Sequence, residues 1–128
     1  MAQRILVVDD DEGFLLAAQH QLKAEGYDVA TARTASEART QLETAKPDLL
    51  LLDVIMPGED GFELSEALSQ NEEFADMPIV LVTSVADNPG RMMRAFQENH
   101  GCSVADVVPK NQVDSLLIST VQAALGEE

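Results

Sequence analysis

Hydrophobic residues along the chain fall into two alternating patterns, short continuous runs and stripes of helical spacing. A continuous apolar run predicts a strand buried on both faces, and apolar residues three or four apart predict a helix with one buried side. The strongest run is Leu49–Leu52, which ends abruptly at Asp53. Pro57, Gly58 and Gly61 then predict a loop. Asp53 is therefore expected at the carboxyl end of a central strand, the edge where open α/β sheets bind ligands.

The two patterns alternate five times along the chain. Such alternation predicts an α/β domain whose parallel sheet carries helices on both faces, joined by right-handed crossovers. The predicted strands are 4–8, 27–32, 49–52, 79–82 and 104–108, and the predicted helices are 14–25, 34–42, 62–69, 89–96 and 113–124.

Local signals mark several ends of these elements. Asp11 is expected to cap the first helix, and Gly26 is a suitable residue to end it. Thr34 and Glu37 have the spacing of a capping box at the start of the second helix. The second strand, 27–32, is more polar than the others, which places it near an edge of the sheet.

Composition narrows the class of protein. The 128 residues, of which 45% are hydrophobic and 24% charged, are expected to form one soluble domain spanning 1–128. No run is long enough to span a membrane and no signal peptide is apparent, so we expect a cytoplasmic location without membrane binding. The single cysteine, Cys102, excludes an internal disulfide and a four-cysteine zinc site.

The charge balance is strongly acidic. Eight Lys and Arg residues stand against 23 Asp and Glu residues, for a net charge of −15. Proteins that grip nucleic-acid phosphates carry basic patches, so direct nucleic-acid binding is not expected. The balance favours binding of cations or docking on a basic partner surface.

Chemically useful side chains follow the predicted strands. Asp9 and Asp10 end the first, Asp53 the third, Thr83 the fourth and Lys110 the fifth. The carboxyl ends of parallel strands share one edge, so these residues can converge there. Three neighbouring carboxylates repel one another, and Mg²⁺ is the natural cation for such oxygen ligands. With Mg²⁺ and one lysine, the site is neutral overall and can accept a phosphoryl dianion.

Short motifs accompany these strand ends. They are Val7-Val8-Asp9-Asp10, Leu52-Asp53 with Met56-Pro57 and Gly61, Val82-Thr83-Ser84, and Lys110. In this order they resemble the receiver domain of two-component response regulators, of the chemotaxis-regulator type, over nearly the whole chain. Each motif alone is common, whereas the ordered series is specific. The resemblance implies a flavodoxin-like, doubly wound, five-stranded parallel sheet of strand order 2-1-3-4-5.

The resemblance also implies roles for individual residues. Asp53 would take a phosphoryl group from a phosphohistidine on a histidine kinase or phosphotransfer protein. Asp10 would bind Mg²⁺ directly, Asp9 directly or through water, and the backbone carbonyl of Ile55 would complete the protein's ligands together with Asp53. Thr83 would hydrogen-bond one phosphoryl oxygen.

Lys110 would pair with another phosphoryl oxygen, and the domain would signal by contact with a downstream protein that the sequence does not identify. It would acquire and slowly lose its own phosphoryl group rather than act as a turnover enzyme. The resemblance further allows weak homodimerisation through the fourth helix, fifth strand and fifth helix.

Several positions depart from the family pattern. Asn111 follows the lysine where proline is usual, and Val107 stands three residues before the lysine, where many members have an aromatic switch residue. Ile55 and Val85 are apolar at positions that influence access of hydrolytic water in the family. We therefore expect slow self-dephosphorylation.

Three other functions compete with this interpretation. A Mg²⁺-dependent aspartyl-phosphate phosphatase of the haloacid dehalogenase type places a second Asp where this chain has Ile55. A flavin-binding module needs a phosphate-cradling loop, but Asp9–Glu12 is uniformly acidic. A degenerate receiver would bind partners without phosphorylation, and the complete set of strand-end residues argues against it.

Overall fold

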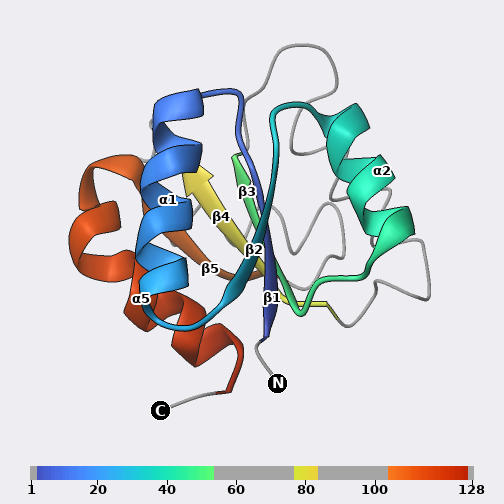
Figure 1. Ribbon diagram of the computed structural model, residues 1–128. Coiled ribbons are helices and arrows are strands. Elements are labelled where there is room, and N and C mark those ends of the chain that lie inside the picture. Colours follow the sequence, from blue (N-terminus) through green and yellow to red (C-terminus); the bar gives the residue numbers. More distant parts are fainter. Residues whose placement is uncertain (1–2, 54–76, 84–103, 127–128) are drawn as a thin grey trace.

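The computed structural model describes residues 3–53, 77–83 and 104–126 (Figure 1). Five parallel strands form one sheet in the order β2-β1-β3-β4-β5. The predicted helices 62–69 and 89–96 lie outside the described residues. The described elements are β1 (Arg4–Val8), α1 (Glu12–Ala24), β2 (Asp28–Ala32), α2 (Ala35–Thr44), β3 (Leu49–Asp53), β4 (Ile79–Thr83), β5 (Val104–Pro109), the 3₁₀ helix η1 (Lys110–Gln112) and α5 (Val113–Ala124).

The leucine strand β3 lies at the centre of this sheet. All five of its residues are buried, as expected for a parallel strand covered on both faces. Helices α1 and α5 cover one face and α2 lies on the other (Figure 1). The doubly wound fold, the strand order and the placement of β2 at an edge are confirmed.

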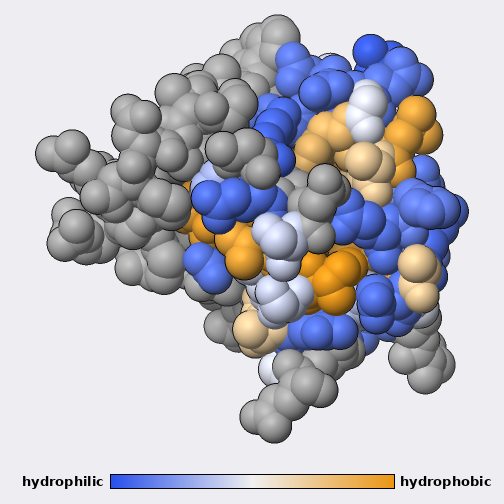
Figure 2. Space-filling model, turned by 90° about the vertical axis from the view of Figure 1, so that its left-hand side faces the viewer, coloured by the Kyte–Doolittle hydropathy of each residue, from blue (hydrophilic) through white to orange (hydrophobic). Residues whose placement is uncertain are grey.

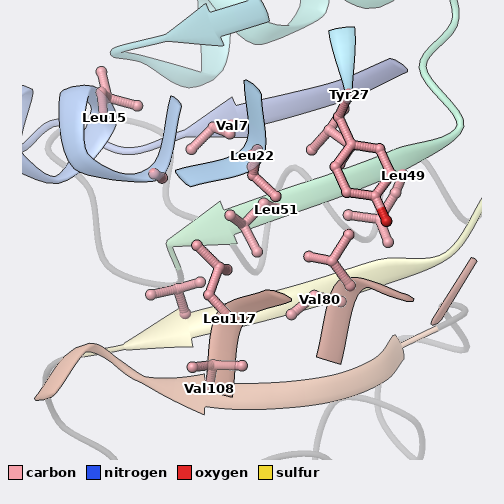
Figure 3. Packing of buried hydrophobic residues seen from close by; sticks show 13 residues of the cluster. Val7, Leu15, Leu22, Tyr27, Leu49, Leu51, Val80, Val108 and Leu117 are labelled. Atoms are coloured by element: carbon pink, nitrogen blue, oxygen red, sulfur yellow. The ribbon is translucent and has the colours of Figure 1, made fainter. Parts of the chain in front are cut away.

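Alternation along the strands divides the core into two layers. In β3, Leu49 and Leu51 face α1 and α5, whereas Leu50 and Leu52 face α2. Figure 3 shows the first layer, where side chains from α1, the sheet and α5 gather around Leu51. Burying one leucine contributes roughly 1.5–3 kcal/mol, so β3 stabilises both layers at once.

Helix α1 begins where the sequence signal for a cap stands. Asp11 Oδ1 accepts hydrogen bonds from the N–H groups of Gly13 (3.0 Å) and Phe14 (3.3 Å), which confirms the predicted cap. The helix starts at Glu12, two residues earlier than the hydrophobic stripe alone predicts, because the cap and not the first apolar residue determines the boundary.

The structure tests two further predicted helix ends, the C-terminus of α1 and the N-terminus of α2. Gly26 has a φ of 93°, the left-handed conformation that ends a helix, as predicted. At α2, Thr34 Oγ1 accepts from the N–H of Glu37 (3.0 Å), so Thr34 is the cap. The Glu37 carboxylate accepts from the N–H of Arg33 (2.7 Å), whereas a capping box would use the N–H of Thr34. The first of the two hydrogen bonds of the predicted capping box is therefore present, and the second is shifted by one residue.

One leucine of α5 departs from the amphipathic pattern of the sequence. Leu117 and Val121 are fully buried, but Leu116, which the pattern also places inward, is 38% exposed.

In the view of Figure 2, hydrophobic residues reach the surface in separate areas between hydrophilic ones. Among the described residues, none of the helices combines the length and apolar character needed to cross a membrane.

Candidate functional site

Three carboxylates meet at the carboxyl edge of the sheet. Val8 in β1 pairs with Leu52 in β3, so the residues that follow, Asp9 and Asp53, are neighbours. One carboxylate oxygen each from Asp9, Asp10 and Asp53 lie within 4.8 Å of one another. Asp9 and Asp53 are buried, whereas Asp10 is exposed. The structure therefore brings together the three side chains predicted to converge.

Lys110 lies directly against this cluster. It is the first residue of η1, immediately after β5, and its side chain is 20% exposed. Its Nζ atom is 2.8 Å from Asp9 Oδ2 and 3.5 Å from Asp53 Oδ2. The same ammonium lies over the ring of Phe14, 5.0 Å from the ring centre. One cation thus contacts two of the three carboxylates.

The Asp9 carboxylate is fully buried, and its two oxygens differ. Oδ1 accepts a hydrogen bond from the N–H of Asp11 (2.9 Å). Oδ2 faces the Lys110 ammonium, but no donor among the described residues is aligned to form a hydrogen bond with it. Burial raises the pKa of Asp9 to about 6, and the negative charge of Asp53 adds to the rise, while Lys110 and the Asp11 N–H oppose it.

The surroundings of Lys110 keep its side chain protonated. Burial by itself would lower the pKa of the ammonium. Contacts with Asp9 and Asp53 outweigh that effect, so the pKa of Lys110 lies above its ordinary value. The side chain is therefore a permanent cation at neutral pH.

Thr83 ends β4 at the same edge. Val82 pairs with Asp53, and Thr83 pairs with Pro109, the residue before Lys110. The register thus places the Thr83 backbone between the strands that carry the acidic cluster and the lysine. Ile55, the expected backbone ligand, lies outside the described residues.

Of the positions that depart from the family pattern, Val107 and Asn111 lie in the part of the chain that the structure describes. Val107 is buried among the residues that face α2, the layer opposite to α1 and α5. The described residues contain no cis peptide bond, so the bond between Lys110 and Asn111 is trans.

The donor set fits a hard divalent cation. Such ions take oxygen ligands at roughly 2.0–2.6 Å, so oxygens that share one ion lie no more than about 5 Å apart. The carboxylate oxygens of Asp9, Asp10 and Asp53 satisfy that limit. The buried Asp9 Oδ2 has no aligned donor within residues 3–53, 77–83 and 104–126, and added positive charge would stabilise this atom.

Residues 5–122 match the family model described as the response regulator receiver domain. The chain belongs to this family. Receiver domains are the signalling domains of two-component systems. They bind Mg²⁺ at an aspartate cluster and interact with histidine kinases or phosphotransfer proteins. The predicted family is confirmed.

Two curated relatives show how much of a longer protein this receiver resembles. It is 43% identical over 84 residues to the Bacillus subtilis alkaline phosphatase synthesis transcriptional regulatory protein PhoP, covering 66% of this chain and 34% of that protein. It is 33% identical over 123 residues to the Caulobacter vibrioides response regulator PleD, covering 96% and 26% respectively. The chain thus spans about a quarter to a third of the length of these relatives.

Solved structures resemble the receiver over its full length. A putative response regulator from Chloroflexus aurantiacus aligns with a TM-score of 0.86 and 28% identity, covering 99% of this chain and 100% of that one. The Vibrio cholerae chemotaxis protein CheY4 aligns with a TM-score of 0.84 and 26% identity, covering 97% and 99%.

One contact of the receiver's site is absent from the sequence predictions. The hydrophobic pattern assigns Phe14 only to a helix, yet its ring meets the Lys110 ammonium. The available signal is an aromatic residue four positions after Asp10, in the first turn of a helix that starts at the acidic edge. Proximity to Lys110, 96 positions away in the sequence, cannot be derived from that signal alone.

Proposed function

We propose that this receiver accepts a phosphoryl group on Asp53 and that Asp9, Asp10, Asp53 and the Ile55 carbonyl hold the Mg²⁺ that the reaction requires. The observation that carries the proposal is the convergence of three carboxylates within 4.8 Å, with a lysine ammonium 3.5 Å from Asp53 Oδ2. A buried carboxylate that faces a cation at the edge of a parallel sheet has the surroundings that a phosphoryl acceptor needs.

The chemistry is an in-line displacement at phosphorus. A carboxylate oxygen of Asp53 forms the new O–P bond while the P–N bond of the phosphohistidine breaks. The leaving imidazole nitrogen keeps the electron pair and takes a proton from solvent, and nothing is oxidised or reduced. When bound, Mg²⁺ would supply positive charge that offsets the charge on the phosphoryl oxygens.

The remaining residues position and neutralise the incoming group. Lys110 donates hydrogen bonds to one phosphoryl oxygen and Thr83 to another. Because phosphoryl transfer needs little covalent help from the protein, this arrangement of charge and donors accounts for the catalysis. An aspartyl-phosphate phosphatase of the haloacid dehalogenase type would need an acid–base side chain two residues after the nucleophile, and Ile55 is aliphatic.

Residues 1–128 act in this proposal as one receiver domain with two kinds of protein partner. A histidine kinase or phosphotransfer protein supplies the phosphoryl group, and a downstream protein reads the result by contact. The net charge of −15 favours basic docking surfaces on both and disfavours nucleic acid. Weak pairing of two copies through the fourth helix, β5 and α5 belongs to the same proposal, and the fourth helix lies outside the described residues.

Incubation with acetyl phosphate and Mg²⁺, followed by intact-mass measurement, tests the proposal. Wild type is expected to gain the mass of one phosphoryl group, and Asp53→Asn is expected to gain none. Asp28→Asn is the matched control, because Asp28 is an exposed aspartate at the start of β2. A wild type that stays unmodified, or an Asp53→Asn variant that is modified as fully as the control, would refute the assignment.

A further inference from the structure

The contact between Phe14 and Lys110 joins two elements that are far apart in the sequence. Phe14 lies in the first turn of α1, and Lys110 opens η1 after β5. An ammonium within about 6 Å of a ring centre is attracted by the electron density of the ring face. The observed distance of 5.0 Å falls inside that range, and both side chains are partly shielded from solvent.

The ring is coupled to the acidic cluster through a short chain of hydrogen bonds. The N–H of Asp11 donates to Asp9 Oδ1 (2.9 Å), and Asp11 Oδ1 in turn accepts from the N–H of Phe14 (3.3 Å). The loop that carries two of the carboxylates and the turn that carries the ring therefore form one unit. The backbone from which the ring projects is thus held relative to Asp9.

Among the described residues the Lys110 ammonium contacts Asp9, Asp53 and the Phe14 ring, and these partners differ in how they would respond to a bound cation. Asp9 and Asp53 attract it through charges that a bound cation or an attached phosphoryl group would offset. The nearest partner, Asp9, is also a member of the cluster that would hold the cation. The Phe14 ring carries no charge and binds no metal ion, so its attraction for the ammonium is unchanged by either event.

We propose that Phe14 is a positioning residue that keeps the Lys110 ammonium beside Asp53 when a divalent cation takes over the carboxylate of Asp9. This role rests on the proposed phosphoryl acceptance, because it assigns to Lys110 a position that matters for that reaction. An aliphatic residue at position 14 would pack in the same place without attracting the ammonium. Phe14 acts through Lys110 and does not itself contact the reacting atoms.

The first test measures geometry and needs no phosphorylation. Protons that lie over an aromatic ring shift upfield in an NMR spectrum, so the side-chain signals of Lys110 near its ammonium are expected upfield of those of the exposed Lys23. The displacement should vanish in Phe14→Leu and persist in wild type at saturating Mg²⁺. Absence of the displacement in wild type, or its loss on addition of Mg²⁺, overturns the proposal.

The second test weakens the attraction of the Phe14 ring for the ammonium with little change in the size of the side chain. Replacing Phe14 by phenylalanines with one, two and three ring fluorines withdraws electron density from the ring face step by step. The rate of phosphorylation by acetyl phosphate at saturating Mg²⁺ is expected to fall along the series, by about fivefold in total, which corresponds to about 1 kcal/mol. In a Lys110→Met background the series should be flat.

A residue with only a packing role gives a different result. Packing would affect the free energy of unfolding along the series, whereas a positioning role requires the rate to follow ring electron density and to depend on Lys110. A flat series in the Lys110 protein, or an equal slope in Lys110→Met, overturns the proposal. If wild type accepts no phosphoryl group, the proposed function fails, and the NMR result alone then decides the role of Phe14.

Discussion

Replacing Asp9 with asparagine should stabilise the protein in the absence of divalent cations. The Asp9 side chain is fully buried, and its pKa is raised from 3.8 to about 6. A carboxyl whose pKa is higher in the folded than in the unfolded state opposes folding when it is ionised. The penalty is absent below pH 3.8, grows as the pH rises toward 6 and is nearly complete above it.

The size of this penalty follows from the two pKa values. Each pH unit of difference is worth about 1.4 kcal/mol, so ionised Asp9 costs about 3 kcal/mol at pH 7. An asparagine side chain would avoid that cost while its oxygen still accepts from the N–H of Asp11. Lys110 loses one partner but keeps Asp53 at 3.5 Å. We therefore expect Asp9→Asn to be more stable than wild type by up to about 3 kcal/mol at pH 7.

Urea denaturation with a chelator present, at pH 7, 5 and 4, measures the effect. The gap between variant and wild type should shrink to about half at pH 5 and become small at pH 4, because the protonated carboxyl resembles the amide. Asp28→Asn serves as the control, since its exposed ion pair with Arg4 (3.7 Å) is worth less than about 1 kcal/mol.

Mg²⁺ should close most of the gap in stability between the variant and wild type. A ligand at about 100 times its dissociation constant stabilises the folded state by about 2.7 kcal/mol, and the variant lacks one of the proposed ligands. Wild type should therefore gain much more stability from Mg²⁺ than Asp9→Asn does. A variant less stable than wild type at pH 7 with chelator, or a gap that does not change with pH, would contradict the predicted cost of ionised Asp9.

Three further predictions concern the core, a turn and the lifetime of the phosphoryl group. Leu51→Ala should lower the free energy of unfolding by about 2–5 kcal/mol. The control Leu16→Ala truncates a side chain that is 62% exposed and should cost less than about 0.5 kcal/mol. Equal losses in urea denaturation would contradict the assigned core. Gly26→Ala should cost about 1–2 kcal/mol in the same assay because alanine is strained at a φ of 93°, and an unchanged stability would count against that reason. Ile55→Asn should shorten the half-life of the phosphorylated protein, followed by intact mass, because a polar side chain there would admit hydrolytic water; an unchanged or longer half-life would disprove it.

Features that depend on a few neighbouring residues could be predicted from the sequence. The cap at Asp11 and the helix end at Gly26 involve partners within a few positions. The apolar run of β3 and its two buried faces follow from Leu49–Leu52 alone. The strand order, by contrast, came from the ordered motifs and the resemblance they carry, because hydrophobic periodicity does not specify which strands pair.

Helix α5 shows where periodicity reaches its limit. Leu116 and Leu117 are adjacent leucines and both fit an amphipathic pattern, yet only Leu117 is fully buried. Their difference depends on how α5 is rotated against the sheet, which is a property of packing with Val121 and its neighbours across the core. The spacing of the apolar residues is compatible with a range of rotations of α5 about its axis, and within that range either leucine could face the core.

The candidate site divides in the same way. The hydrophobic runs of the sequence place Asp9, Asp10, Asp53 and Lys110 at strand ends, and parallel pairing requires such ends to share an edge. Which of them are in contact emerges from the folded chain: Lys110 lies closest to Asp9, at 2.8 Å, and over the ring of Phe14. Distances of this kind depend on strand register and on the docking of α1 beside η1, which are outcomes of packing across the whole sheet rather than of any local run of residues.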